Sequence, residues 1–203
     1  MDVRLLTTPE HFEAMQHNAA YAMLTCHANT EKLRHEPSRS FIEKAIKAGH
    51  DSILEHITLT YEVNNLSRAC LQELARHRHI SLSVESTRHT LKKHINDESK
   101  PFYVPGNLQI TLDGEKINPA EIMCIFLMQG ARDSNISNDI LKYYIPEFWP
   151  TNLVMTANVR ELRHIVKLRT SPAALKEFQD LARKFVEVLP DDFKYLLEDC
   201  VHE

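Results

Sequence analysis

The sequence predicts an α+β fold, mostly helical, with a small antiparallel sheet, in a single domain spanning residues 1–203. Several segments carry apolar residues at helical spacing, whereas residues 57–63 alternate apolar and polar side chains as a half-buried strand does. The chain also shows no internal repeat and no low-complexity linker that would mark a domain boundary. These three observations together indicate one domain of mixed secondary structure.

The N-terminal elements are expected to be helices that lead into a strand. Pro9 begins a helical region over residues 9–48, and its last part, residues 38–48, has apolar side chains at helical spacing. Gly49 follows directly, as glycine often does just past the end of a helix. The strand at 57–63 comes next, with one face toward the core.

The middle of the chain is expected to turn at Asn64-Asn65 and then to form a helix from about Leu66 to His77. Residues 79–94 are polar and basic and show no clear period. Phe102 to Pro105 indicates a short extended piece, and residues 107–116 indicate a turn or hairpin. Helical spacing and favourable first-turn prolines predict the remaining helices at about 119–132, 156–170, 172–189 and 191–200.

Bulk composition excludes several classes of protein. The 203 residues are 43% hydrophobic and 26% charged, as in an ordinary globular protein. The sequence contains no run of about 18 apolar residues that could cross a membrane, and its N-terminus lacks the pattern of a secretory signal. Four widely spaced cysteines indicate reduced thiols. We therefore expect a cytoplasmic protein with no membrane partner and no bound metal.

Glycine is scarce in this chain. There are only 4 glycines, where average usage predicts about 14. Because they are scattered singly, neither a G-x-G-x-x-G fingerprint nor a P-loop can be written. A bound nucleotide would therefore have to be held by side chains and not by a glycine-rich backbone cradle.

Basic and hydroxyl side chains are concentrated between residues 76 and 94. The run RHRH at 76–79 precedes Ser, Thr and Arg at 86–88, and Glu85 is the single acid opposite five Arg and Lys residues. Guanidinium groups bind phosphate bidentately, and hydroxyl groups can complete the shell of donors. The segment therefore predicts a phosphate site built from side chains. Two alternatives stay open: a solvated basic turn, and a zinc site at the histidines, which the flanking arginines would disfavour.

One arginine is expected on the apolar side of a helix. At about 100° per residue, Leu162, Ile165 and Arg169 fall on the same side of their helix as Asn158. An unpaired buried charge is very costly, so Arg169 must either reach solvent at the helix end or meet an anion.

The basic segment resembles the signature of a known family. Arg76-His77-Arg78, seven further residues and then Ser86 reproduce the RHR-x7-S motif of the flavin-dependent thymidylate synthases. The resemblance covers most of residues 40–200, and the stretch at 174–182 is similar to the short members from epsilonproteobacteria. Other segments resemble the family in the same order: Gly49-His50 through His56, Leu66 to Ala69, Asn158-x-Arg160 and Leu168-Arg169.

This resemblance implies a fold, a reaction and a set of partners. Family members have an α/β-type fold and form homotetramers in which each active site is shared between subunits. They bind FAD, use NADPH and methylenetetrahydrofolate as co-substrates, and methylate dUMP at C5 to give dTMP. The same activity is therefore expected here.

The resemblance also implies residue roles. An arginine at the uracil ring would stabilise the negative charge that makes C5 nucleophilic, and Ser86 is expected on the phosphate side, since no general base is evident beside it. Lys142 stands where arginine is usual and can meet a phosphate only as a point charge. The implied catalytic residues are Arg169, Arg76, Ser86 and His50. The implied FAD-binding residues are Ser52, Arg76, His77, Arg78, Asn158 and His164. The implied dUMP-binding residues are Glu73, Arg76, Ser86, Thr87, Arg88, Lys142 and Arg169.

Two other functions fit parts of the sequence. A related UMP/dUMP C5-methylase with altered substrate would carry the same motif, because recognition of the missing 2′-hydroxyl leaves no signature. A nucleic-acid-binding module could use residues 76–94 as a basic patch. The net charge of −4 and the absence of any aromatic except histidine in that segment disfavour the second alternative.

Overall fold

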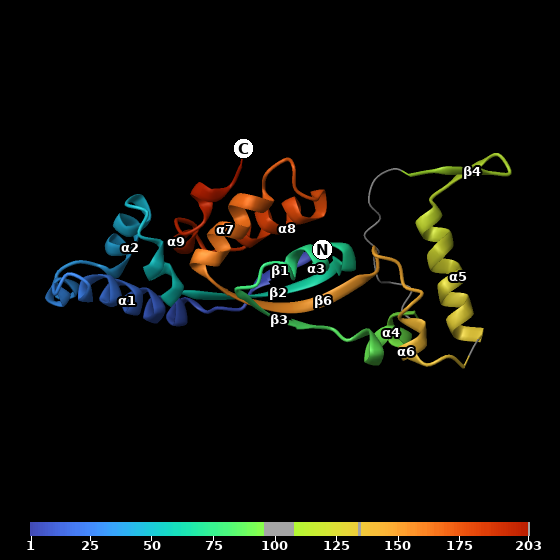
Figure 1. Ribbon diagram of the computed structural model, residues 1–203, viewed down its shortest axis with the longest axis horizontal. Helices are drawn as coiled ribbons and strands as arrows, with labels where there is room; N and C mark the ends of the chain where they lie inside the picture. The colour runs from blue at the N-terminus through green and yellow to red at the C-terminus, as the bar shows by residue number, and fades with distance from the viewer. Residues whose placement is uncertain (96–107, 134, 203) are drawn as a thin grey trace.

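A four-stranded antiparallel sheet forms the centre of the molecule (Figure 1). The computed structural model describes residues 1–95, 108–133 and 135–202. Helices α7 (Val159–Arg169) and α8 (Lys176–Glu187) cover one face of the sheet. The expected α+β fold, mostly helical with a small antiparallel sheet, is confirmed. In spatial order the strands are β1 (Asp2–Leu5), β2 (Thr58–Ser67), β6 (Pro150–Asn158) and β3 (Ile80–Val84).

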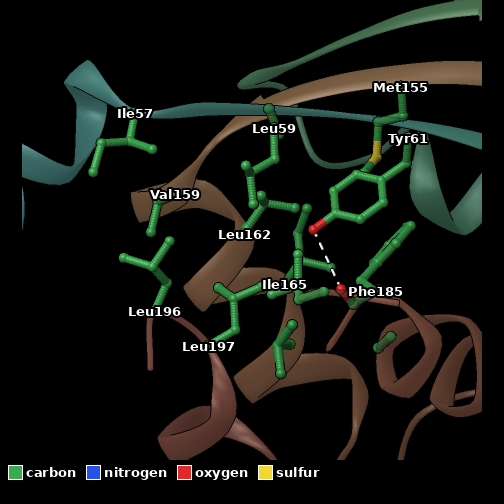
Figure 2. Close-up of a cluster of buried hydrophobic side chains, with 14 of the residues drawn as sticks. Ile57, Leu59, Tyr61, Met155, Val159, Leu162, Ile165, Phe185, Leu196 and Leu197 are labelled. Atoms are coloured by element: carbon green, nitrogen blue, oxygen red, sulfur yellow. Dashed lines mark hydrogen bonds between the residues drawn. The ribbon is translucent and has the colours of Figure 1, made fainter. Parts of the chain in front are cut away.

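The main core lies between the sheet and these two helices (Figure 2). Leu59 and Tyr61 point from β2 toward Leu162 and Ile165 of α7, which confirms that the alternating residues of this strand are buried on one side. Each such side chain contributes about 1.5–3 kcal/mol on full burial. The buried Tyr61 hydroxyl donates a hydrogen bond of 3.3 Å to the backbone oxygen of Phe185, so the core leaves this polar group paired.

Two helices at one end of the sheet confirm the expected N-terminal helical region. Helix α1 (Pro9–Thr25) begins at a proline, and its cap Thr8 accepts a hydrogen bond from the backbone of His11. Helix α2 (Ser38–Lys47) ends before Gly49, which has a φ of 70°. The segments η1 (Thr30–Arg34) and η2 (Asp51–His56) are short 3₁₀ turns, so the region is not one continuous helix.

An arm extends beyond the other end of the sheet (Figure 1). The elements of this arm pack together around a separate apolar cluster, which includes Leu91, Leu141 and Trp149. The β4–β5 pair confirms the hairpin expected within 107–116, whereas the extended piece expected at 102–105 lies outside the described residues. The elements of the arm are α4 (Thr87–Ile95), β4 (Ile110–Leu112), β5 (Glu115–Ile117), α5 (Pro119–Asp133) and α6 (Asn138–Leu141).

The turn expected at Asn64-Asn65 is wrong. Strand β2 continues through these residues to Ser67, and the register against β6 shifts between Val63 and Leu66, as a bulge causes. Asn65 takes the left-handed conformation, with a φ of 59°, which asparagine tolerates better than most residues. Helix α3 (Arg68–Leu74) therefore begins two residues later than predicted and also ends earlier.

The limits of several other elements also differ from the prediction. The helix expected at 156–170 begins only at Val159, because β6 occupies the preceding residues in the middle of the sheet. Residues 79–94, which show no period, form β3 and α4. Helix α8 is shorter than the predicted 172–189, and the predicted 191–200 helix divides into α9 (Asp191–Lys194) and η3 (Glu198–Cys200). Within the described residues, no helix combines the length and apolar character needed to cross a membrane.

Candidate active site

The C-terminal end of α7 places Arg169 against the end of α3. The Nε of Arg169 donates to Nε2 of His77 at 3.0 Å, and its Nη1 donates to Oε2 of Glu73 at 3.1 Å. Only 15% of the Arg169 side chain is exposed. The arginine expected on the apolar side of its helix therefore does meet an anion, and that anion is a carboxylate of this chain. Glu73, His77 and Arg169 therefore form one hydrogen-bonded cluster.

The Arg169 guanidinium also packs over the face of an aromatic ring. The Cζ of Arg169 lies 4.7 Å from the centre of the Phe178 ring, within the range of a cation–π contact, and Phe178 on α8 is fully buried. The His77 ring meets the same phenyl ring edge-on, with 5.9 Å between ring centres. Phe178 was not among the residues that the sequence analysis assigned to the site, because an aromatic residue at helical spacing is ordinarily a core residue.

His77 is buried, with 6% of the residue exposed. Its Nδ1 lies 3.3 Å from Oε1 of Glu161, in the first turn of α7. Burial and the nearby Arg169 charge lower the pKa of His77 below its ordinary range, although Glu161 opposes them. His77 is therefore neutral at neutral pH.

A buried carboxylate holds α3 in place. Ser67 caps α3 by accepting from the backbone nitrogen of Cys70 at 3.0 Å. Glu177 of α8, only 2% exposed, accepts from the Ser67 backbone nitrogen at 2.8 Å and also from the Ser67 hydroxyl. A buried carboxylate is tolerated only when it is hydrogen-bonded in this way. These two hydrogen bonds between Glu177 and Ser67, which we call the clamp, join the helix that carries Glu73 to the helix that carries Phe178.

A cavity of about 800 Å³ lies along α7, from its cap Asn158 to Lys167. This volume falls within the range of about 300–1,000 Å³ that is usual for small-molecule sites. Asn158, Glu161 and His164 line it, together with three cationic side chains of α7: Arg160, Arg163 and Lys167. Four carboxylates line it as well: Asp51, Glu55, Glu161 and Asp199. Arg160 pairs with Glu55 at 2.5 Å and Arg163 with Asp199 at 2.6 Å, so a phosphate group here would meet Lys167 directly and the two arginines only in competition with their carboxylates.

Two of the six predicted FAD-binding residues line this cavity, and the other four do not. Asn158 and His164 line it, and His77 reaches it through Glu161. Arg78 is exposed. Ser52 and His50, the latter predicted as catalytic, are exposed on and just before η2, whose Asp51 and Glu55 line the cavity.

The predicted dUMP-binding residues fall into two groups. Glu73, Arg76 and Arg169 form one group, in which Arg76 pairs with Glu73 at 3.2 Å. The second group lies in the arm, where Ser86 directly precedes α4, Thr87 and Arg88 begin it, and Lys142 follows α6. Arg88 pairs with Asp139 of α6 at 2.5 Å. One chain therefore does not bring the two groups together: the first lies beside the sheet and the second beyond its end (Figure 1).

Hydrogen bonds to Glu85 hold the turn before Ser86, and the residues that make them were not among the predicted site residues. Glu85 accepts from Nδ2 of Asn152 at 2.7 Å, and its backbone nitrogen donates to the Asn152 carbonyl at 2.8 Å. The same carboxylate contacts the buried His94. In residues 1–95, 108–133 and 135–202 no group of three or more His, Cys, Asp or Glu is placed to hold a metal ion.

Comparison with known proteins places these features in a family context. Residues 8–192 match the family model described as thymidylate synthase complementing protein. The flavin-dependent thymidylate synthase of Campylobacter jejuni is 37% identical over 190 residues, which are 91% of this chain and 92% of that protein. The flavin-dependent thymidylate synthase of Helicobacter pylori is 40% identical over 162 residues, which are 75% of this chain and 76% of that protein.

Two solved structures are also similar to this chain. A crystal structure of thymidylate synthase X (ThyX) from Helicobacter pylori with FAD and dUMP superposes with a TM-score of 0.78 at 32% identity, with 100% of both chains covered. A UMP/dUMP methylase, PolB from Streptomyces cacaoi, reaches a TM-score of 0.70 at 20% identity and covers 98% of this chain and 92% of its own. The second likeness is one of fold alone.

Proposed function

This chain belongs to the flavin-dependent thymidylate synthase family, and from that premise we propose which of its residues carry the reaction. The activity is the methylation of dUMP at C5 to give dTMP, with FAD as the cofactor. The alternative of an altered UMP/dUMP methylase is not favoured, because the likeness to that protein is limited to the fold. The nucleic-acid-binding alternative is not favoured either.

The observation that carries the proposal is the partly buried Arg169 guanidinium at the C-terminal end of α7, the helix that also lines a cavity of nucleotide size. Glu73 and Phe178 hold this guanidinium in one orientation, and within the described residues its Nη2 has no hydrogen-bond partner. We assign Nη2 to the edge of the uracil ring. A fixed positive charge there stabilises the negative charge that develops on the ring, and this makes C5 nucleophilic.

The residues that line the cavity fit FAD in size and charge. Lys167 offers a cation to its diphosphate, and Asn158 and His164 offer polar side chains, whereas Arg160 and Arg163 would have to exchange Glu55 and Asp199 for it. When bound, FAD supplies the hydride that completes the methyl group. The roles of Ser52, Arg76, Arg78 and His50 on the flavin side stay proposals that rest on the family resemblance.

The separation of the two dUMP-binding groups supports an active site shared between subunits. We assign Ser86, Thr87, Arg88 and Lys142 to the phosphate of a dUMP whose ring lies at Arg169 of a neighbouring subunit. The arm has the exposed apolar surface that such an assembly requires: Phe126 is 72% exposed and Tyr144 is 67% exposed, and both line an apolar cavity of about 420 Å³. A homotetramer that works in the cytoplasm, with residues 1–203 as its single domain and NADPH and methylenetetrahydrofolate as co-substrates, completes the proposal.

The test is direct. The purified protein is expected to be yellow with bound oxidised flavin and to form dTMP from dUMP when NADPH and methylenetetrahydrofolate are added. UMP in place of dUMP serves as the control for substrate preference. A colourless protein that takes up no added FAD, or one that methylates UMP in preference to dUMP, would overturn the proposal.

A further inference from the structure

The hydrogen bonds around His77 determine where its proton lies. A guanidinium can only donate hydrogen bonds, because all of its nitrogens are protonated or lack an available lone pair. The contact of 3.0 Å from Arg169 Nε to His77 Nε2 therefore requires that Nε2 accepts. In this arrangement Nε2 carries no proton.

The other ring nitrogen must then carry the proton. A neutral imidazole has one N–H, so in His77 it belongs to Nδ1. The group that faces Nδ1 is the Glu161 carboxylate, with Oε1 at 3.3 Å, and an ionised carboxylate can only accept. The three side chains therefore form a directed chain in which Arg169 donates to His77 and His77 donates to Glu161.

Glu161 is placed for this contact by its position in α7. It is the third residue after the cap Asn158, whose Oδ1 accepts from the Glu161 backbone nitrogen at 2.8 Å. A glutamate at this position commonly turns back to the backbone of the cap residue. Here its carboxylate, only 12% exposed, instead reaches across to α3 and His77. Helix capping therefore accounts for the position of its backbone but not for the direction of its side chain.

We infer that Glu161 is a positioning residue of the active site: by accepting the Nδ1 proton of His77, it holds the tautomer whose Nε2 aims the Arg169 guanidinium. This inference rests on the proposed role of Arg169 at the uracil ring. Without Glu161, the His77 proton is free to move to Nε2, where it would point at a guanidinium N–H. Arg169 would then lose one of its contacts and its fixed orientation.

The first test reads the tautomer itself. In protein containing isotope-labelled histidine, the nitrogen resonances of His77 distinguish a protonated Nδ1 from a protonated Nε2, and a His77→Gln spectrum assigns them among the 12 histidines. The wild-type holoenzyme is expected to show a protonated Nδ1, and Glu161→Ala to show proton density on Nε2. A wild-type protein with its proton on Nε2, or a Glu161→Ala protein with the wild-type pattern, would overturn the inference.

The second test measures binding of dUMP to the FAD-loaded enzyme. Glu161→Ala is expected to weaken dUMP binding about tenfold, in the range of one hydrogen bond to a charged group. Glu161→Gln is expected to stay within about threefold of wild type, because its amide oxygen can still accept the Nδ1 proton. Glu187→Ala, an exposed position on α8, is the matched control and should leave dUMP binding unchanged.

A double-mutant comparison separates positioning from direct contact with the cofactor, since Glu161 also lines the cavity. If Glu161 acts through Arg169, then Glu161→Ala should have little further effect on dUMP binding in an Arg169→Lys background. Fully additive losses, or equal losses in the Ala and Gln variants, would overturn the inference. A wild-type holoenzyme that bound no dUMP would instead contradict the proposed function, while the tautomer measurement would still decide the inference.

Discussion

Replacing Phe178 by leucine removes the ring that supports the Arg169 guanidinium. The contact is 4.7 Å from guanidinium carbon to ring centre, and 15% of the Arg169 side chain is exposed. Because cation–π contacts contribute about 0.5–1 kcal/mol when exposed and about 2 kcal/mol when desolvated, this one should contribute about 1–2 kcal/mol. The Phe178→Leu protein also loses some packing in a fully buried position, so its total loss of unfolding free energy should be larger.

The pairwise term can be isolated by a double-mutant cycle. Urea unfolding of the FAD-loaded protein at fixed concentration would be measured for wild type, Phe178→Leu, Arg169→Met and the double variant. We expect a coupling energy of about 1–2 kcal/mol, since the packing loss is common to both backgrounds and cancels. Phe185→Leu on the same helix is the control, because that ring packs against Tyr61 at 4.8 Å and should show no coupling to Arg169→Met. Single losses of Phe178 and Arg169 that add within about 0.5 kcal/mol would refute the reasoning.

Three further predictions concern the clamp, the histidine and the flavin. Glu177→Ala should lower the unfolding free energy by about 2–5 kcal/mol, because it leaves the backbone nitrogen and hydroxyl of the buried Ser67 unpaired; a urea midpoint equal to that of wild type would contradict the clamp. His77 has a lowered pKa in the folded protein, so stability should be independent of its titration above 6.5 and should fall as pH drops below that value, where the unfolded chain takes up the proton first. Urea midpoints between pH 8 and pH 5 should show this slope in wild type and a smaller one in His77→Gln, and parallel curves would count against it. Arg78→Ala should weaken retention of FAD on dialysis, whereas unchanged flavin occupancy would remove Arg78 from the cofactor site.

Local patterns predicted the parts of the fold in which one period dominates. The alternation from Ile57 to Val63 correctly located the main part of β2, and helical spacing located α2 and α5. Strand β6 was not predicted, because the helical pattern of α7 follows it directly and its alternation becomes informative only when β2 and β3 pair with it on both sides. The bulge at Asn65 was taken for a turn for a similar reason: a left-handed residue serves either purpose, and the pairing with β6 decides.

The sequence named candidate residues for the site but did not show how they are arranged. The family resemblance singled out Arg76, His77 and Ser86 as candidates, yet it could not show that His77 points inward while Arg76 is exposed. Helical geometry did place Arg169 on the apolar side of α7, and of the two outcomes expected there, reaching solvent or meeting an anion, the structure shows the second. Glu161 and Phe178 carried no signal of their own, because a glutamate in a first helical turn and a phenylalanine in an apolar stripe have ordinary structural roles.

The most direct test of the central claim is the turnover of Arg169→Ala with its flavin still bound. We expect FAD occupancy, judged from the flavin absorbance of the purified protein, to stay at the wild-type level. Formation of dTMP from dUMP should fall by about 100-fold or more, as it does when a group that stabilises developing charge is removed. A variant that keeps its flavin and turns over dUMP within a few-fold of wild type would contradict the assignment of Arg169 to the uracil ring.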